Sequence, residues 1–160
     1  MVYSKCILIV SSNSPIKTDA VIIGAGPVGL FQVFELGLLD LKAELIDSLP
    51  QVGGQCSELY PEKPIYDIPA YPTIGAQELV DKLMEQIKPF NAGIHLKQQV
   101  ERFEKRDDGR FTVVTSTGTT FDTGAVIIAA GLGSFLPRKL KAKGLDEVTT
   151  DQIQYKVKDR

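Results

Sequence analysis

The sequence contains no tryptophan, one histidine and two cysteines, and it has no excess of basic residues. Its 18 lysines and arginines stand against 20 aspartates and glutamates, which gives a net charge of −2 and a pI near 5.4. A protein that binds a nucleic-acid backbone usually carries a basic surface, so nucleic acid is not predicted as a partner. With 43% apolar residues, the 160-residue chain predicts one soluble globular domain.

The rare residues offer no metal or disulfide chemistry. Cys6 and Cys56 lie fifty positions apart, which excludes a CxxC pair and a disulfide framework. We interpret both as small packing residues in a reducing compartment, so the predicted location is cytoplasmic. His95 has no sequence partner for a metal site or a catalytic triad, and we therefore predict no metal and no catalytic residue.

Long apolar runs are also absent. The run from Cys6 to Val10 has five residues, whereas a signal sequence needs ~7–15 and a membrane span ~20. We therefore predict no targeting segment and no membrane contact. Residues 1–19 are treated as a leader of unknown role, either a short extra strand or an overhang.

A βαβ unit is predicted from Ala20 onward. The continuous apolar run at 20–23 is typical of a strand buried on both faces, and residues 30–39 predict a buried helix. Residues 43–47 predict the second strand of the unit. Five of the nine prolines then fall within residues 48–75, which predicts an irregular and functional connection.

The remainder of the pattern predicts one more helix and a return to the sheet. Residues 77–90 carry an apolar stripe at helical spacing. Turn signals separate three strand-like runs, which predict an antiparallel meander, and a further apolar run predicts a last parallel strand. The meander runs are residues 94–104, 110–116 and 119–122, and the last strand is 125–129. The predicted fold is a Rossmann-like α/β domain with a parallel sheet plus an antiparallel β-meander.

A glycine motif lies between the first strand and the first helix. In Gly24-x-Gly26-x-x-Gly29, the first glycine permits a tight turn, the second lets a pyrophosphate approach, and the third allows close packing of helix and strand. Asp47 lies 18 residues after Gly29, at the end of the second strand, where its carboxylate can accept from ribose hydroxyls. The motif predicts a dinucleotide site and leaves NAD and FAD both open.

A second glycine turn favours a flavin. Gly54, within Gly53-Gly54-Gln55, lets the backbone approach a bulky planar ring, and the Gln55 amide can both donate and accept. Tyr60 is followed by Pro61 and, three residues on, by Pro64, which makes it a stiff aromatic platform.

Residues 53–69 read GGQCSELYPEKPIYDIP. This stretch resembles the ferredoxin (flavodoxin):NADP reductases of the thioredoxin-reductase-like type, in which YPEK-x-IYD follows GGQ. Residues 131–140 resemble the same family, and the resemblance covers about residues 19–158. Because Cys56 has no second cysteine five positions on, the flavin-proximal disulfide of glutathione-reductase-like enzymes is excluded.

The resemblance implies FAD as the cofactor. It places Asp47 on the adenosine ribose, the Val100 backbone at the adenine, Gln55 and Tyr60 at the flavin end, and Phe135 near the cofactor. Asp47 stands where the family usually has Glu, so its reach toward the ribose is shorter. The full set of predicted cofactor-binding residues is Gly24, Gly26, Pro27, Gly29, Asp47, Gly54, Gln55, Tyr60, Val100, Ala130, Gly131 and Phe135.

The resemblance also implies a function. The chain would be the FAD-binding part of a flavoprotein oxidoreductase that passes electrons from NADPH to ferredoxin or flavodoxin, and it allows a homodimer. Residues 20–150 would be an incomplete FAD-binding domain and 151–160 the start of a crossover to a missing NADPH domain, so the chain alone is predicted to be inactive. Two alternatives stay open: a fragment of a thioredoxin-reductase-like disulfide reductase, and a truncated FAD-binding module without turnover.

Overall fold

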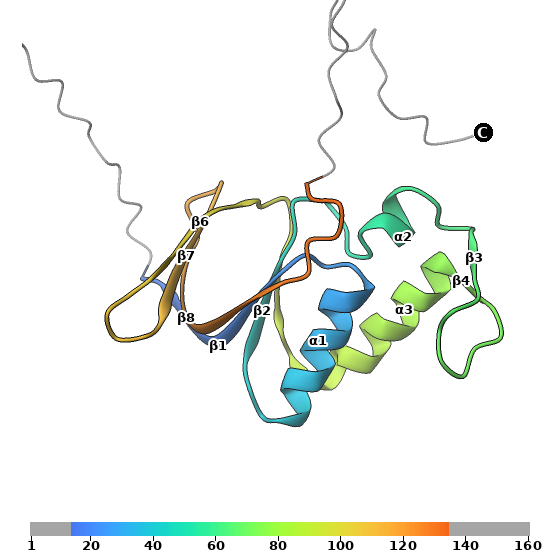
Figure 1. The fold of residues 1–160 in the computed structure, drawn as a ribbon, viewed down its shortest axis with the longest axis horizontal. Coiled ribbons are helices and arrows are strands. Elements are labelled where there is room, and N and C mark those ends of the chain that lie inside the picture. Colours follow the sequence, from blue (N-terminus) through green and yellow to red (C-terminus); the bar gives the residue numbers. More distant parts are fainter. Residues whose placement is uncertain (1–13, 135–160) are drawn as a thin grey trace, which may run out of the picture.

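The computed structural model describes residues 14–134 (Figure 1). Four parallel strands lie in the order β5 (Gly93–His95), β2 (Ala43–Ile46), β1 (Ile16–Ile23) and β8 (Thr120–Ile128). An antiparallel meander extends this sheet from β8 through β7 (Phe111–Thr115) to β6 (Val100–Lys105). The prediction of a Rossmann-like fold with a parallel sheet and a meander is confirmed.

Helices α1 (Pro27–Leu38) and α3 (Ala76–Ile87) pack side by side against one face of the parallel strands (Figure 1). Ile22 of β1 belongs to the core on this face, whereas Val21 belongs to a second core with Val113 and Phe121 of the meander. Both faces of β1 are therefore covered, which explains its continuous apolar run. Among residues 14–134, no helix is long and apolar enough to cross a bilayer.

Most of the proline-rich segment is irregular, as predicted. It contains only the short helix α2 (Gln55–Glu58) and the two-residue strands β3 (Pro64–Ile65) and β4 (Ile74–Gly75). The next helix, α3, gives way to a 3-10 helix at Lys88–Phe90. Pro89 has no N–H to donate to the α-helical ladder, which accounts for the change.

Strand β1 begins four residues before the predicted Ala20. Thr18 is buried, pairs with Thr123 of β8, and its hydroxyl donates to the Lys42 carbonyl at 2.8 Å. In the first half of β1, the exposed Lys17 and Asp19 alternate with the less exposed Ile16 and Thr18. This half therefore lacks the apolar run that marks the second half.

Two strand predictions were wrong in detail. Residues 94–104 do not form one strand, because β5 and β6 lie at opposite edges of the sheet. Lys97, between them, has a left-handed φ of 56°, and its N–H donates to the Leu49 carbonyl at 2.9 Å. Conversely, the two runs predicted at 119–122 and 125–129 belong to the single strand β8.

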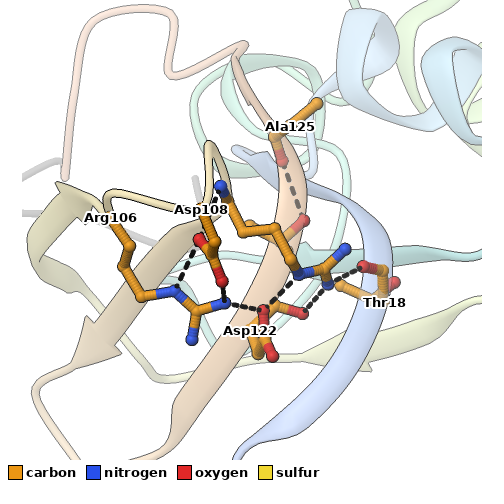
Figure 2. Close-up of polar contacts among 7 residues, drawn as sticks. Thr18, Arg106, Asp108, Asp122 and Ala125 are labelled. Atoms are coloured by element: carbon orange, nitrogen blue, oxygen red, sulfur yellow. Dashed lines mark hydrogen bonds and ion pairs between the residues drawn. The ribbon is translucent and has the colours of Figure 1, made fainter.

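An ion-pair cluster ties the meander to the parallel sheet (Figure 2). Asp122 of β8 accepts from Arg110 Nε at 2.6 Å and from Arg106 Nη2 at 2.9 Å. Arg110 Nη2 also donates to the Thr18 carbonyl of β1 at 3.1 Å. The hydrogen bond from Arg110, together with the nearby charge of Arg106, lowers the pKa of Asp122.

Candidate functional site

A groove opens where the carboxyl ends of β1, β2 and β8 meet, which is the usual ligand position in an open α/β sheet. It consists of two adjoining cavities of about 310 Å³ and 250 Å³. We call them the first and second cavity. Both are lined by Gly24, Asp47, Ala130 and Gly133, so a single elongated ligand can span them. This is the shape that a dinucleotide requires.

The glycine turn forms the floor of the groove. Gly24 has a left-handed φ of 109°, and a Cβ there would collide with the Ala129 carbonyl. A Cβ on Gly29 would collide with the Gly24 carbonyl, so helix α1 packs directly on the turn. Pro27 begins α1, and the N-cap Gly26 provides no side-chain cap. The first N–H groups of α1 are therefore left for an anion such as a pyrophosphate.

A second glycine loop faces the first. The Gly53 N–H donates to the Ala25 carbonyl at 2.8 Å, which fixes the two loops together. A Cβ on Gly54 would lie 3.1 Å from the Cα of Gly26. Side chains at these two positions would fill the space between the loops. Glycine at both positions lets the two loops lie in contact and gives the second cavity a backbone lining without side chains, which we call the cradle.

Asp47 connects three segments of the site. One of its carboxylate oxygens accepts from the Ala25 N–H at 2.6 Å, and the other accepts from the Leu49 N–H at 2.9 Å. The Asp47 backbone N–H donates to the His95 carbonyl at 2.9 Å. Each carboxylate oxygen has a second lone pair, so the side chain can still accept from a ribose hydroxyl. No motif in the sequence marks the hydrogen bond between the Asp47 carboxylate and the Ala25 N–H of the glycine turn.

The second cavity ends at Gln55 and Tyr60. The Tyr60 hydroxyl donates to the Gln55 side-chain oxygen at 2.8 Å, and the Lys63 ammonium lies 5.0 Å from the centre of the Tyr60 ring. Gly131 lies beside the Gln55 amide nitrogen, which leaves that donor close to the cavity. The ring and the amide thus form a connected polar and aromatic wall.

Cys56 lines the same cavity as a free thiol. Partial burial raises its pKa, so less thiolate is present at neutral pH than for an ordinary cysteine. A raised pKa does not suit a nucleophile for thiol–disulfide exchange. The sequence interpretation of Cys56 as a packing residue agrees with its contact with the α1–α3 core.

The structure brings together eleven of the twelve predicted cofactor-binding residues. Ten of them, Val100 included, line one or both cavities, and Gly29 packs within the glycine turn. Phe135 lies outside the described residues, as do Cys6 and the predicted crossover at 151–160. The binding roles of all twelve residues stay predictions.

The sequence analysis missed several groove residues. Ser48, Gln98 and Gln99 line the first cavity, and none belongs to a motif. It also missed the pair between His95 Nε2 and Glu44 Oε2, which lie 2.6 Å apart across β5 and β2. Within residues 14–134, no group of three metal-ligating side chains comes together.

Fold and groove together define a dinucleotide-binding α/β protein of the Rossmann type. The family model of the pyridine nucleotide-disulphide oxidoreductases matches residues 18–159, and the chain belongs to that family.

Individual proteins similar to this chain point to one group within the family. The chain is 60% identical over 93% of its length to a ferredoxin–NADP reductase of Methylibium petroleiphilum, and 60% identical over 93% to ferredoxin–NADP reductase 2 of Cupriavidus taiwanensis. It spans 41% and 40% of the lengths of these relatives. A thioredoxin reductase structure from Lactococcus lactis matches 81% of this chain and 40% of its own, with 27% identity and a TM-score of 0.63. The predicted resemblance to thioredoxin-reductase-like ferredoxin–NADP reductases is confirmed.

Proposed function

We propose that this chain is the FAD-binding part of an oxidoreductase that transfers electrons from NADPH to ferredoxin or flavodoxin. The observation that carries the proposal is the groove itself. Asp47 lies where the two cavities adjoin and binds the glycine turn, and the facing glycine loops and the Gln55–Tyr60 pair line the second cavity. The relatives named ferredoxin–NADP reductase support this electron transfer for the whole protein.

In this proposal each part of the groove has a separate task. The free N–H groups at the start of α1 bind the pyrophosphate, because they combine hydrogen-bond donors with the positive end of the helix dipole. Asp47 holds the adenosine ribose, and the Val100 backbone lies at the adenine. Tyr60 stacks on the flavin ring and Gln55 orients it. A bound flavin would supply the hydride-accepting and electron-transferring chemistry.

The domain arrangement is part of the proposal. The FAD-binding domain is assigned to residues 20–150 and the start of a crossover to an NADPH-binding domain to residues 151–160, of which residues 135–160 lie outside the described part of the chain. NADPH is therefore expected to bind only when that domain is present. A cytoplasmic location and assembly as a homodimer belong to the same proposal.

The identity of the cofactor is tested by extraction. The purified chain is incubated with equal concentrations of FAD and NAD, separated from free nucleotide, and denatured. Chromatography of the released nucleotide is expected to show FAD. Release of NAD alone would overturn the flavoprotein assignment.

The electron acceptor is tested on the full-length protein. NADPH oxidation is followed with ferredoxin, flavodoxin or a thioredoxin disulfide as the acceptor. Faster turnover with ferredoxin or flavodoxin supports the proposal. A clear preference for the disulfide would instead favour the thioredoxin-reductase-like alternative, which the Lactococcus lactis structure suggests.

A further inference from the structure

The first cavity contains a side chain whose orientation is fixed by two hydroxyl groups. Gln98 lies on the connection between β5 and β6 and lines this cavity together with Asp47. Its backbone N–H donates to the Asp47 carbonyl at 3.0 Å. Gln98 is therefore joined directly to the residue that we expect to hold the ribose.

The side-chain oxygen of Gln98 accepts two hydrogen bonds. The Thr115 and Thr117 hydroxyls each donate to Gln98 Oε1 at 2.9 Å. Thr115 is only 1% exposed, so its hydroxyl is held in place by the β6–β7–β8 meander. The Thr119 hydroxyl oxygen lies 3.1 Å from that of Thr117 and extends this row of hydroxyl groups.

With the oxygen held in this way, the amide nitrogen is directed away from the threonines. Within residues 14–134, no hydrogen bond engages Gln98 Nε2, and this atom is not sealed from solvent. A donor that is oriented in advance loses little entropy when a ligand accepts from it. Such an arrangement is typical of a recognition residue.

We infer that Gln98 is a binding residue for the adenosine end of the dinucleotide, with Nε2 donating to an acceptor atom of the adenosine. The inference rests on the proposed function, because it assumes a dinucleotide in the groove. Purine ring nitrogens and ribose oxygens are the acceptors that an amide N–H can use there. Thr115 and Thr117 act as positioning residues that hold the amide in one orientation.

The test compares two variants of Gln98. Gln98→Glu keeps an oxygen for the threonines and removes the donor, whereas Gln98→Met keeps the length of the side chain and adds no charge. Binding of FAD and of ADP is measured by calorimetry, since ADP carries the adenosine and the pyrophosphate but no flavin. Both variants are expected to bind both ligands about fivefold more weakly.

Thr117→Val serves as the matched positioning variant, because it removes one hydroxyl and leaves Gln98 intact. It is expected to weaken ADP binding about twofold, less than either Gln98 variant, while the free energy of unfolding without ligand stays near that of the unmodified chain.

Three results would overturn the inference. Loss of affinity in Gln98→Glu alone would indicate charge repulsion and not a lost donor. Binding of ADP within twofold of the unmodified chain by both variants would show that Nε2 makes no contact. Weaker binding of FAD with unchanged binding of ADP would place Gln98 away from the adenosine. Failure of the proposed function is distinguishable, since the unmodified chain would then bind ADP but not FAD.

Discussion

Asp47→Ala is expected to lower the free energy of unfolding of the ligand-free chain by about 1.5–3 kcal/mol. The carboxylate accepts from the Ala25 and Leu49 N–H groups at 2.6 and 2.9 Å. A hydrogen bond to a charged group contributes about 1.5–3 kcal/mol, and two such bonds are lost. Asp47 is half-buried at the edge of the groove, so water reaches the freed N–H groups and offsets about half of the loss.

The measurement is urea denaturation followed by tyrosine fluorescence, because the chain has five tyrosines and no tryptophan. Asp81→Ala is the matched control, since Asp81 is exposed and, among residues 14–134, its carboxylate accepts only from Gln77 Nε2, at 2.9 Å. The control is expected to lose less than about 0.5 kcal/mol. An equally small loss for Asp47→Ala would refute the argument that this carboxylate holds the glycine turn.

Two further predictions follow from the groove and from the ion-pair cluster. Gly26→Ala is expected to leave the fold stable and weaken FAD binding more than tenfold, because its Cβ would lie 4.0 Å from Gly54 Cα, inside the cradle. Gly29→Ala is expected to unfold the chain instead, because its Cβ would collide with the Gly24 carbonyl. Thermal melts and FAD titrations of both variants test this difference. Equal stability and equal FAD affinity of the two variants would contradict it. Acidification is expected to destabilise the meander, because the pKa of Asp122 is lowered in the folded state. The stabilisation from Asp122 is then present above the unfolded pKa of about 3.9 and is lost as pH falls through the lower, folded value, so Asp122→Asn should flatten the dependence of stability on pH below about pH 5.

The βαβ unit at the start of the fold, and helix α3, could be predicted because their signals are local. The strand at 20–23, the glycine turn and α1 follow one another directly, and each has its own pattern of apolar residues or glycine. The apolar stripe of α3 likewise lies within one helix. Such patterns can be recognised in the sequence because each one involves residues that are close together along the chain.

The placement of β5 and β6 could not be predicted, because it depends on a residue with no special propensity. Lys97 adopts a left-handed conformation that glycine or asparagine would normally signal. Its N–H is held by Leu49, which lies 48 positions earlier in the chain. The turn is thus stabilised by a distant segment and leaves no trace in the residues around it.

The role of a glycine inside α1 also could not be predicted from the residues around it. Gly37 costs the helix about 1 kcal/mol relative to alanine, which the sequence alone presents as a weakness. In the structure a Cβ at Gly37 would collide with the ring of Phe90. The glycine therefore allows the 3-10 helix after α3 to pack against α1, and Phe90 in turn lies edge-on to Phe34 with ring centres 5.8 Å apart.

Motif spacing identified Asp47 as a residue of the groove, whereas long-range hydrogen bonds hold it in place. Asp47 accepts from Ala25 through its side chain and from Gln98 through its carbonyl, so it joins the glycine turn to the first cavity. The meander continues this connection, because the Thr115 and Thr117 hydroxyls orient Gln98. A dinucleotide that spans both cavities would contact all of these segments at once. If the dinucleotide binds as proposed, the antiparallel meander belongs to the binding site as well as to the fold, a relationship that no local pattern in the sequence shows.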